Sequence, residues 1–201
     1  MVNVNNVKEY FKEKFNKYGT TPQGEDWNSI ESQTIRFDQL IEVIDSSQPY
    51  SIIDYGCGYG ALIDHLRSLK HSFTYQGMDI LEDVISSAKE LHRDCFFTAN
   101  EQELTPADYV VESGIFNIKL DADYDDWTTH VLDTLNIMDR LAIKGFAFNC
   151  LTRYSDAEFM RPNLYYADPC FLFDYCKINF SRNVALLHDY ELYDFTILVR
   201  K

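Results

Sequence analysis

The sequence predicts a single α/β domain whose mostly parallel sheet is covered by helices on both faces. Three observations lead to this prediction. Apolar runs of strand length alternate with helical patterns from residue 51 to residue 180. The first of these runs ends in a glycine-rich turn at residues 54–61, directly before a helix. The segment 183–201 contains two β-rich runs separated by a short polar turn, which predicts a final antiparallel hairpin.

Two helices are expected before the first strand. Apolar side chains recur at helical spacing over residues 6–18, and Gly19 ends the pattern. A second helix is expected over residues 29–44, with Ser29 or Asn28 as its cap. We expect residues 1–45 to form a helical cap or lid and residues 46–201 to form the main domain.

The remaining elements alternate along the chain. Long apolar-patterned stretches predict helices, and short β-rich runs predict strands. The expected strands cover residues 51–55, 73–80, 95–100, 144–151, 183–188 and 195–201, and residues 107–116 are expected to form a strand that runs into a loop. The expected helices cover residues 61–70, 81–91, 124–142 and 169–180. The polar stretch 152–169 is too long for an ordinary connection, so we expect it to serve function.

Composition and charge restrict the partners and the compartment. The chain has 201 residues and a formal charge of -14. A surface with this excess of negative charge repels a phosphate backbone, so nucleic acid is not an expected partner. The N-terminus lacks the apolar core of a secretory signal, and no apolar run reaches membrane-spanning length. The chain has five cysteines, and no two of them form a C-x-x-C motif. We therefore expect reduced thiols in the cytoplasm and no metal site.

Two interpretations compete for the glycine-rich turn. Read as Gly56-x-Gly58-x-x-Ala61, it satisfies the dinucleotide fingerprint. Read with Asp54 ahead of the glycines, it resembles motif I of the class I S-adenosylmethionine-dependent methyltransferases. A carboxylate beside the glycines repels a pyrophosphate but suits the ammonium and sulfonium of S-adenosylmethionine. Asp79, at the end of the second predicted strand, can accept from ribose hydroxyls and supports either nucleoside.

The wider chain also resembles these methyltransferases. The similarity runs from about Trp27 onward and is carried by "GEDWNSIESQTIRF", "DYVVESGIFNIKL", "GFAFNCLT" and "VALLHDYELYDFTILVRK". These stretches look like a small bacterial group with an "SGIFN" loop and no established substrate. The resemblance implies a Rossmann-like class I methyltransferase fold with a seven-stranded sheet, a C-terminal antiparallel hairpin and helices on both faces. It also implies S-adenosyl-L-methionine as cofactor and S-adenosyl-L-homocysteine as product.

The implied cofactor site draws on five segments. Asp79 is expected at the ribose, Asn100 or Glu101 at the adenine amine, and Arg36 at the methionine carboxylate. Cys57 is expected to be a packed residue. The full expected set is Gln33, Arg36, Asp54, Gly56, Cys57, Gly58, Gly60, Asp79, Ile80, Asn100, Glu101, Ser113 and Gly114.

The acceptor side offers weaker signals. No catalytic base is identified, and the candidates for the reacting region are Asn117, Tyr154 and Tyr166. The loop at residues 112–117 lacks the Asn-Pro-Pro-Tyr signature of nucleobase and glutamine N-methyltransferases, which disfavours DNA and ribosome factors as substrates. We expect the acceptor pocket between the region of Trp27 and Arg36, this loop, and the Tyr-rich stretch 152–169.

The expected function is methyl transfer from S-adenosylmethionine to an oxygen or nitrogen of a small-molecule acceptor. Two alternatives stay open. One is an NAD-dependent oxidoreductase or epimerase, disfavoured by Asp54 and by the C-terminal hairpin. The other is a regulatory module that binds a nucleoside without turnover.

Overall fold

A mixed sheet of seven strands forms the centre of the molecule. The structure is a computed structural model that describes residues 2–201. Its strands alternate with helices as the sequence predicted, and the last two form the expected antiparallel hairpin. The strands are β1 (Tyr50–Tyr55), β2 (Phe73–Met78), β3 (Phe96–Thr98), β4 (Ala107–Ser113), β5 (Ala142–Leu151), β6 (Asn183–Leu187) and β7 (Asp194–Arg200).

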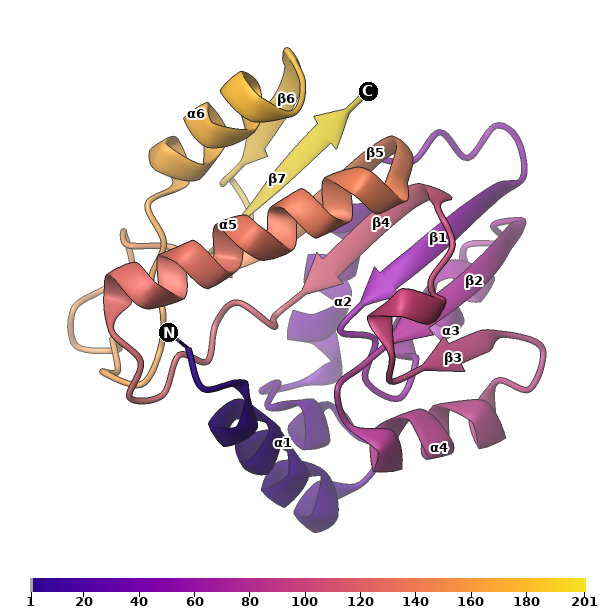
Figure 1. Cartoon of the computed structure of the whole chain (residues 1–201), viewed down its shortest axis with the longest axis horizontal. Coiled ribbons are helices and arrows are strands. Elements are labelled where there is room, and N and C mark those ends of the chain that lie inside the picture. Colours follow the sequence, from indigo (N-terminus) through magenta and orange to yellow (C-terminus); the bar gives the residue numbers. More distant parts are fainter. Residues whose placement is uncertain (1) are drawn as a thin grey trace.

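The strand order is β3-β2-β1-β4-β5-β7-β6 (Figure 1). Strands β1 to β5 pair in parallel, whereas β7 lies antiparallel between β5 and β6. The order reverses between β1 and β4, so the loops after these two strands diverge to opposite sides. In open α/β sheets this switch point is where ligands bind.

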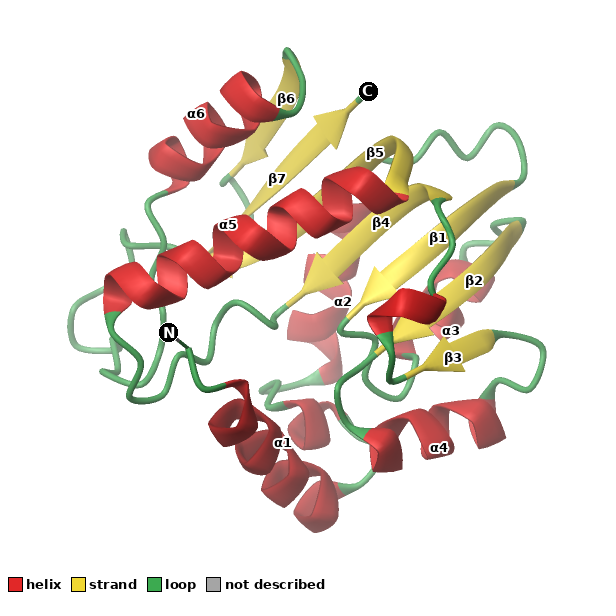
Figure 2. Cartoon of the chain, in the orientation of Figure 1, coloured by secondary structure: helices red, strands yellow, loops and turns green. Residues whose placement is uncertain are grey.

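Helices cover both faces of the sheet (Figure 2). An apolar core lies between the sheet and each helix layer. One core receives side chains from α2, α3 and α4, and the other receives them from α1, α5 and α6. The helices are α1 (Val4–Tyr18), α2 (Ile30–Ile41), α3 (Ala61–Ser68), α4 (Glu82–Leu91), α5 (Tyr124–Leu141) and α6 (Pro169–Asn179), with short 3-10 turns η1 (Pro22–Glu25) and η2 (Glu101–Glu103). None of the helices in this part of the chain is long and apolar enough to cross a membrane.

Local signals set the helix starts. Ser29 caps α2 through a capping box, in which its side chain accepts from the backbone N–H of Ser32 and Ser32 returns the contact. Asp123 and Asp168 cap α5 and α6 without a capping box, by accepting from backbone amides of the first turn. The Ser29 cap agrees with the sequence prediction.

The N-terminal helix α1 takes a place that the sequence did not predict in detail. The connection from β3 to β4 holds only η2, so no full helix covers the sheet there. Val7 and Phe11 of α1 line a cavity together with Gly56, Asp79 and Gly114, which follow β1, β2 and β4. Figure 1 shows α1 beyond the arrowheads of β1 and β4. The helix therefore lies over the carboxyl ends of the parallel strands, where a ligand site is expected.

Candidate functional site

The turn between β1 and α3 has the alternating glycines that the motif predicted. Gly56, Gly58 and Gly60 all have φ in the left-handed region, at 89°, 51° and 89°. A Cβ at Gly56 would lie 2.2 Å from Cγ2 of Ile115, in the loop after β4. The turn therefore needs glycine both for its backbone conformation and for its close approach to the neighbouring loop.

The backbone N–H groups of this turn all donate to acceptors of the protein. Two of the acceptors are carboxylates, one from the end of β2 and one from η1. Gly56 N and Cys57 N donate to Met78 O (2.7 and 2.9 Å), Gly58 N to Asp79 Oδ2 (3.2 Å), Tyr59 N to Glu25 Oε1 (2.9 Å), and Gly60 N to Cys57 O (2.9 Å). The turn thus presents carboxylates, rather than open amide donors, to an incoming ligand.

Three carboxylates gather at this turn, and burial raises the pKa of each. Burial is the main cause for Glu25, whose pKa rises to about 8, and for Asp54, whose pKa rises to about 7. The charge of Asp79 adds to both shifts, and burial also raises the pKa of Asp79 itself. Asp54 accepts from the Tyr75 hydroxyl at 2.7 Å, which opposes its shift. The region favours a positively charged ligand.

A cavity of about 170 Å³ opens beside these carboxylates. It lies at the switch point, between the ends of β1, β2 and β4 on one side and α1 and α5 on the other. Its walls are mostly apolar, apart from Glu25, Asp79, Ser113, His130 and Thr134. Of the predicted cofactor residues it brings together Gly56, Gly58, Asp79, Ile80, Ser113 and Gly114.

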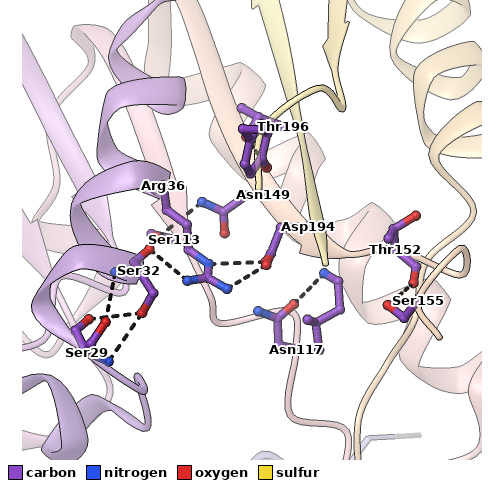
Figure 3. A network of polar contacts seen from close by, with 12 residues as sticks. Ser29, Ser32, Arg36, Ser113, Asn117, Asn149, Thr152, Ser155, Asp194 and Thr196 are labelled. Atoms are coloured by element: carbon purple, nitrogen blue, oxygen red, sulfur yellow. Dashed lines mark hydrogen bonds and ion pairs between the residues drawn. The ribbon is translucent and has the colours of Figure 1, made fainter. Parts of the chain in front are cut away.

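Arg36 lies outside the cavity wall and has another partner. Its guanidinium donates to both carboxylate oxygens of Asp194 (3.2 and 2.5 Å) and to the Ser32 carbonyl (2.8 Å), as Figure 3 shows. Asp194 is fully buried and has no other basic partner among the ion pairs of the described residues. Arg36 therefore joins α2 to β7, and its contact with a methionine carboxylate stays a prediction.

Gln33 and Trp27 flank the cavity from the same N-terminal segment. The Gln33 amide donates to Glu25 Oε2 at 2.7 Å, so it supports a cavity residue without lining the cavity. The Trp27 ring packs against the Arg36 guanidinium, with 4.4 Å between Arg36 Cζ and the ring centroid. A Cβ at Gly114 would lie 2.5 Å from this ring, so Trp27 covers the glycine of the loop after β4.

The remaining predicted cofactor residues also lie behind or beside the cavity wall. Asn100 is exposed and caps η2 by accepting from Gln102 N, and Glu101 accepts from the Tyr55 hydroxyl at 2.5 Å. Cys57 is buried, and its burial raises the pKa of the thiol. Asp54, Cys57 and Gly60 support the turn from inside the fold, and none of them is part of the cavity lining.

The three candidates for the reacting region do not line the cavity either. Asn117 is buried, and its Oδ1 accepts from Leu151 N at 2.9 Å, which ties the loop after β4 to the end of β5. Tyr154 is 64% exposed, and the Tyr166 hydroxyl accepts from Arg161 N at 2.9 Å. The Tyr-rich stretch instead packs near α5, where Tyr165 is buried beside Tyr124.

Helix faces supply cavity residues that the sequence analysis missed. Trp127, His130 and Thr134 follow the i, i+3, i+7 spacing along α5, and three apolar side chains of α1 follow the same spacing. This periodicity marks an inward face but does not say what the face covers. No sequence pattern predicted that Glu25, in the stretch "GEDW", would line the cavity. The α1 side chains are Val4, Val7 and Phe11.

Solved structures of methyltransferases share this fold. Magnesium protoporphyrin IX methyltransferase from Synechocystis PCC 6803, with S-adenosylhomocysteine bound, superimposes with a TM-score of 0.63 at 16% identity, over 85% of this chain and 84% of that one. Human N-acetylserotonin methyltransferase in complex with S-adenosylmethionine gives a TM-score of 0.61 at 16% identity, over 85% of this chain and 53% of that one. At such identities the likeness concerns the fold alone.

Sequence comparison gives a stronger relation. No family model matches the chain. The Mycobacterium tuberculosis protein named "Putative methyltransferase Rv1506c" is 46% identical over 164 residues, which cover 80% of this chain and 99% of that protein. The chain therefore belongs to the same methyltransferase family as this mycobacterial protein, and it has the class I methyltransferase fold.

Proposed function

We propose that this methyltransferase takes its methyl group from S-adenosylmethionine and transfers it to an oxygen or nitrogen of a small-molecule acceptor. The observation that carries the proposal is the glycine turn, whose amides from Gly56 to Gly60 all have acceptors in the protein and beside which Glu25 and Asp79 line the cavity. A ligand at this turn has to bring positive charge and hydroxyl or ammonium donors. S-adenosylmethionine has all of these.

The residues present fit this cofactor. Asp79 accepts one backbone N–H on each carboxylate oxygen, from Gly58 and Leu81, and keeps lone pairs for ribose hydroxyls. Gly56 and Gly58 lie in the cavity wall, and Ile80 offers an apolar surface beside Asp79. When bound, the cofactor supplies an electrophilic methyl group on a sulfonium.

The dinucleotide alternative conflicts with the same geometry. A pyrophosphate binds to unpaired amides at the start of a helix and is repelled by nearby anions. Here Glu25 and Asp79 occupy the amides of Tyr59 and Gly58. An NAD phosphate would have to displace two carboxylates from the turn.

The acceptor is expected in the apolar part of the cavity. Trp27, Trp127 and the inner face of α1 form much of this wall, which would keep water from the sulfonium. We propose residues 1–45 as the cap over this side. His130 is the one imidazole among the described lining residues, and burial lowers its pKa, so it is neutral at pH 7 and able to accept a proton.

The charge and the thiols support a cytoplasmic enzyme that acts on small molecules. The formal charge of -14 disfavours a polyanionic substrate. The five cysteines are free, and three of them are buried, as suits a reducing compartment.

The proposal is tested by isothermal titration calorimetry with S-adenosylhomocysteine, NAD and ATP. We expect micromolar affinity for S-adenosylhomocysteine and at least about 100-fold weaker binding of NAD, a gap of about 3 kcal/mol. Equal affinity for NAD would refute the cofactor assignment. Transfer of labelled methyl from S-adenosylmethionine into the low-molecular-mass fraction of a cell extract tests the acceptor class. Label in nucleic acid or protein would refute a small-molecule acceptor, and binding without any transfer would favour the regulatory module.

A further inference from the structure

Glu25 reaches the glycine turn from a separate part of the chain. It ends η1, whose position is fixed by the following residue: the Asp26 carboxylate accepts from Tyr10 and Lys14 of α1, each at 2.5 Å. A Cβ at Gly24 would lie 2.1 Å from the carbonyl oxygen of Gly19, so η1 packs tightly against the end of α1. The carboxylate is therefore positioned by the fold of the N-terminal segment.

The two oxygens of Glu25 are oriented separately. Oε1 accepts from Tyr59 N at 2.9 Å, and Oε2 accepts from Gln33 Nε2 at 2.7 Å. A Cβ at Gly58 would lie 1.6 Å from Oε1, so only glycine at that position admits the carboxylate. Each oxygen keeps a further lone pair for another donor.

The surroundings of Glu25 lack a compensating cation. Asp79 and Asp54 face it from the ends of β2 and β1, and their charges raise its pKa further. The polar groups facing it from the glycine turn and α2 are the Tyr59 amide and phenol, the Cys57 thiol and the neutral Gln33 amide. Lys8 of α1 acts on Asp79. No Lys or Arg is among the described residues that line the cavity.

We propose that Glu25 binds the α-ammonium group of S-adenosylmethionine and so makes the N-terminal segment part of the cofactor site. This assignment rests on the proposed function. An ammonium offers three N–H donors to a carboxylate, whereas a sulfonium offers none, so an oriented hydrogen-bonding carboxylate suits the ammonium.

Binding of an ammonium group at Glu25 also changes the protonation of this carboxylate. With a pKa of about 8, Glu25 is mostly protonated at pH 7 in the ligand-free protein. An ammonium placed against it favours the ionised form. Binding should therefore release part of a proton at pH 7, and a ligand without the ammonium should release much less.

The experiment compares two ligands and two variants by calorimetry. S-adenosylhomocysteine carries the ammonium, whereas 5′-methylthioadenosine lacks the whole amino acid portion. For Glu25→Gln we expect about 10- to 100-fold weaker binding of S-adenosylhomocysteine and less than about threefold change for methylthioadenosine. Glu31→Gln, an exposed glutamate in the first turn of α2, is the matched control and should change neither affinity.

A second measurement needs no variant. The binding enthalpy of each ligand to the wild-type protein is compared in phosphate and Tris buffers at pH 7, which differ in ionisation enthalpy. We expect proton release with S-adenosylhomocysteine and little with methylthioadenosine. If Glu25→Gln lowers the affinity for both ligands equally, or if both ligands release the same number of protons from the wild-type protein, Glu25 has a structural role only and the inference is overturned. If the wild-type protein binds neither ligand, the proposed cofactor itself is refuted, and the inference with it.

Discussion

Asp79 acts at the scale of single hydrogen bonds. It follows β2, and its oxygens accept from Gly58 N at 3.2 Å and Leu81 N at 2.9 Å. One carboxylate thus joins the glycine turn to the start of α4, and it also lines the cavity. The two backbone donors fix its orientation before any ligand arrives, which reduces the ordering that binding requires.

Replacing Asp79→Asn should weaken cofactor binding. The amide nitrogen cannot accept, so one backbone N–H or one ribose hydroxyl loses its acceptor, and the negative charge is lost. We expect the affinity for S-adenosylhomocysteine to fall by about 2 to 3 kcal/mol, with a lower melting temperature as well. Calorimetry and thermal melting check both, with Asp83→Asn in the exposed first turn of α4 as the control. Wild-type affinity in Asp79→Asn would place the ribose elsewhere.

At the scale of elements, a buried ion pair connects the N-terminal segment to the C-terminal hairpin. Arg36 of α2 and Asp194 of β7 are 158 positions apart, and both are buried. The guanidinium also stacks with Trp27, which covers Gly114 in the loop after β4. Arg36 therefore joins α2, β7 and the segment of Trp27, and Trp27 in turn contacts the loop after β4 in the cavity wall.

Breaking this pair should cost far more stability than breaking an exposed one. Asp194→Asn leaves a buried guanidinium without its counter-charge, and we expect a loss of about 3 to 5 kcal/mol in urea unfolding. The control is Asp94→Asn, which removes the exposed pair with Arg67 and should cost less than about 1 kcal/mol. The double replacement Arg36→Met with Asp194→Leu should recover much of the loss. Similar costs for Asp194→Asn and Asp94→Asn would contradict this account.

At the scale of the whole molecule, the order of strands creates the site. The sheet reverses its order between β1 and β4, and α1 lies over the space that opens there. The fold brings Glu25, Asp54 and Asp79 together at this one edge of the sheet. Repulsion between their charges therefore lowers the free energy of unfolding of the whole domain. The ligand-free protein is then stabilised by protons held on these groups.

The stability of the ligand-free protein should therefore fall as pH rises from 7 to 9. Folding raises the pKa of Glu25 to about 8 and that of Asp54 to about 7, so the folded state holds more protons than the unfolded state. Stability from such groups is complete below their unfolded pKa and is lost as pH rises through the folded pKa. Melting temperatures across this range check the direction.

Comparison with Glu25→Gln isolates the carboxylate. Burial also raises the pKa of the Cys57 and Cys150 thiols, which act in the same direction over the same range. The variant keeps the thiols and lacks the titrating carboxylate, so its melting temperature should fall less steeply than that of the wild-type protein. An identical slope would show that Glu25 does not titrate in this range.

The sequence by itself determined the features that depend on chain neighbours. The glycine turn after β1, Asp79 after β2, the Ser29 cap and the final hairpin all follow from residue type and short spacing. Their backbone conformations are set within a few residues: left-handed glycines, a side chain that accepts from an amide two or three positions away, and alternation with period two. The fold class followed from the order of these local signals.

Only the tertiary structure decided the partners of the polar side chains. From its spacing, Arg36 had several acidic residues within reach, and it pairs with Asp194 at the other end of the chain. Glu25 lies on the amide of Tyr59, and Asn117 accepts from Leu151, because the sheet brings these distant segments to one edge. Periodicity shows which face of a helix points inward. A charged or amide group, however, forms hydrogen bonds with whichever donor or acceptor the packing places within about 3 Å.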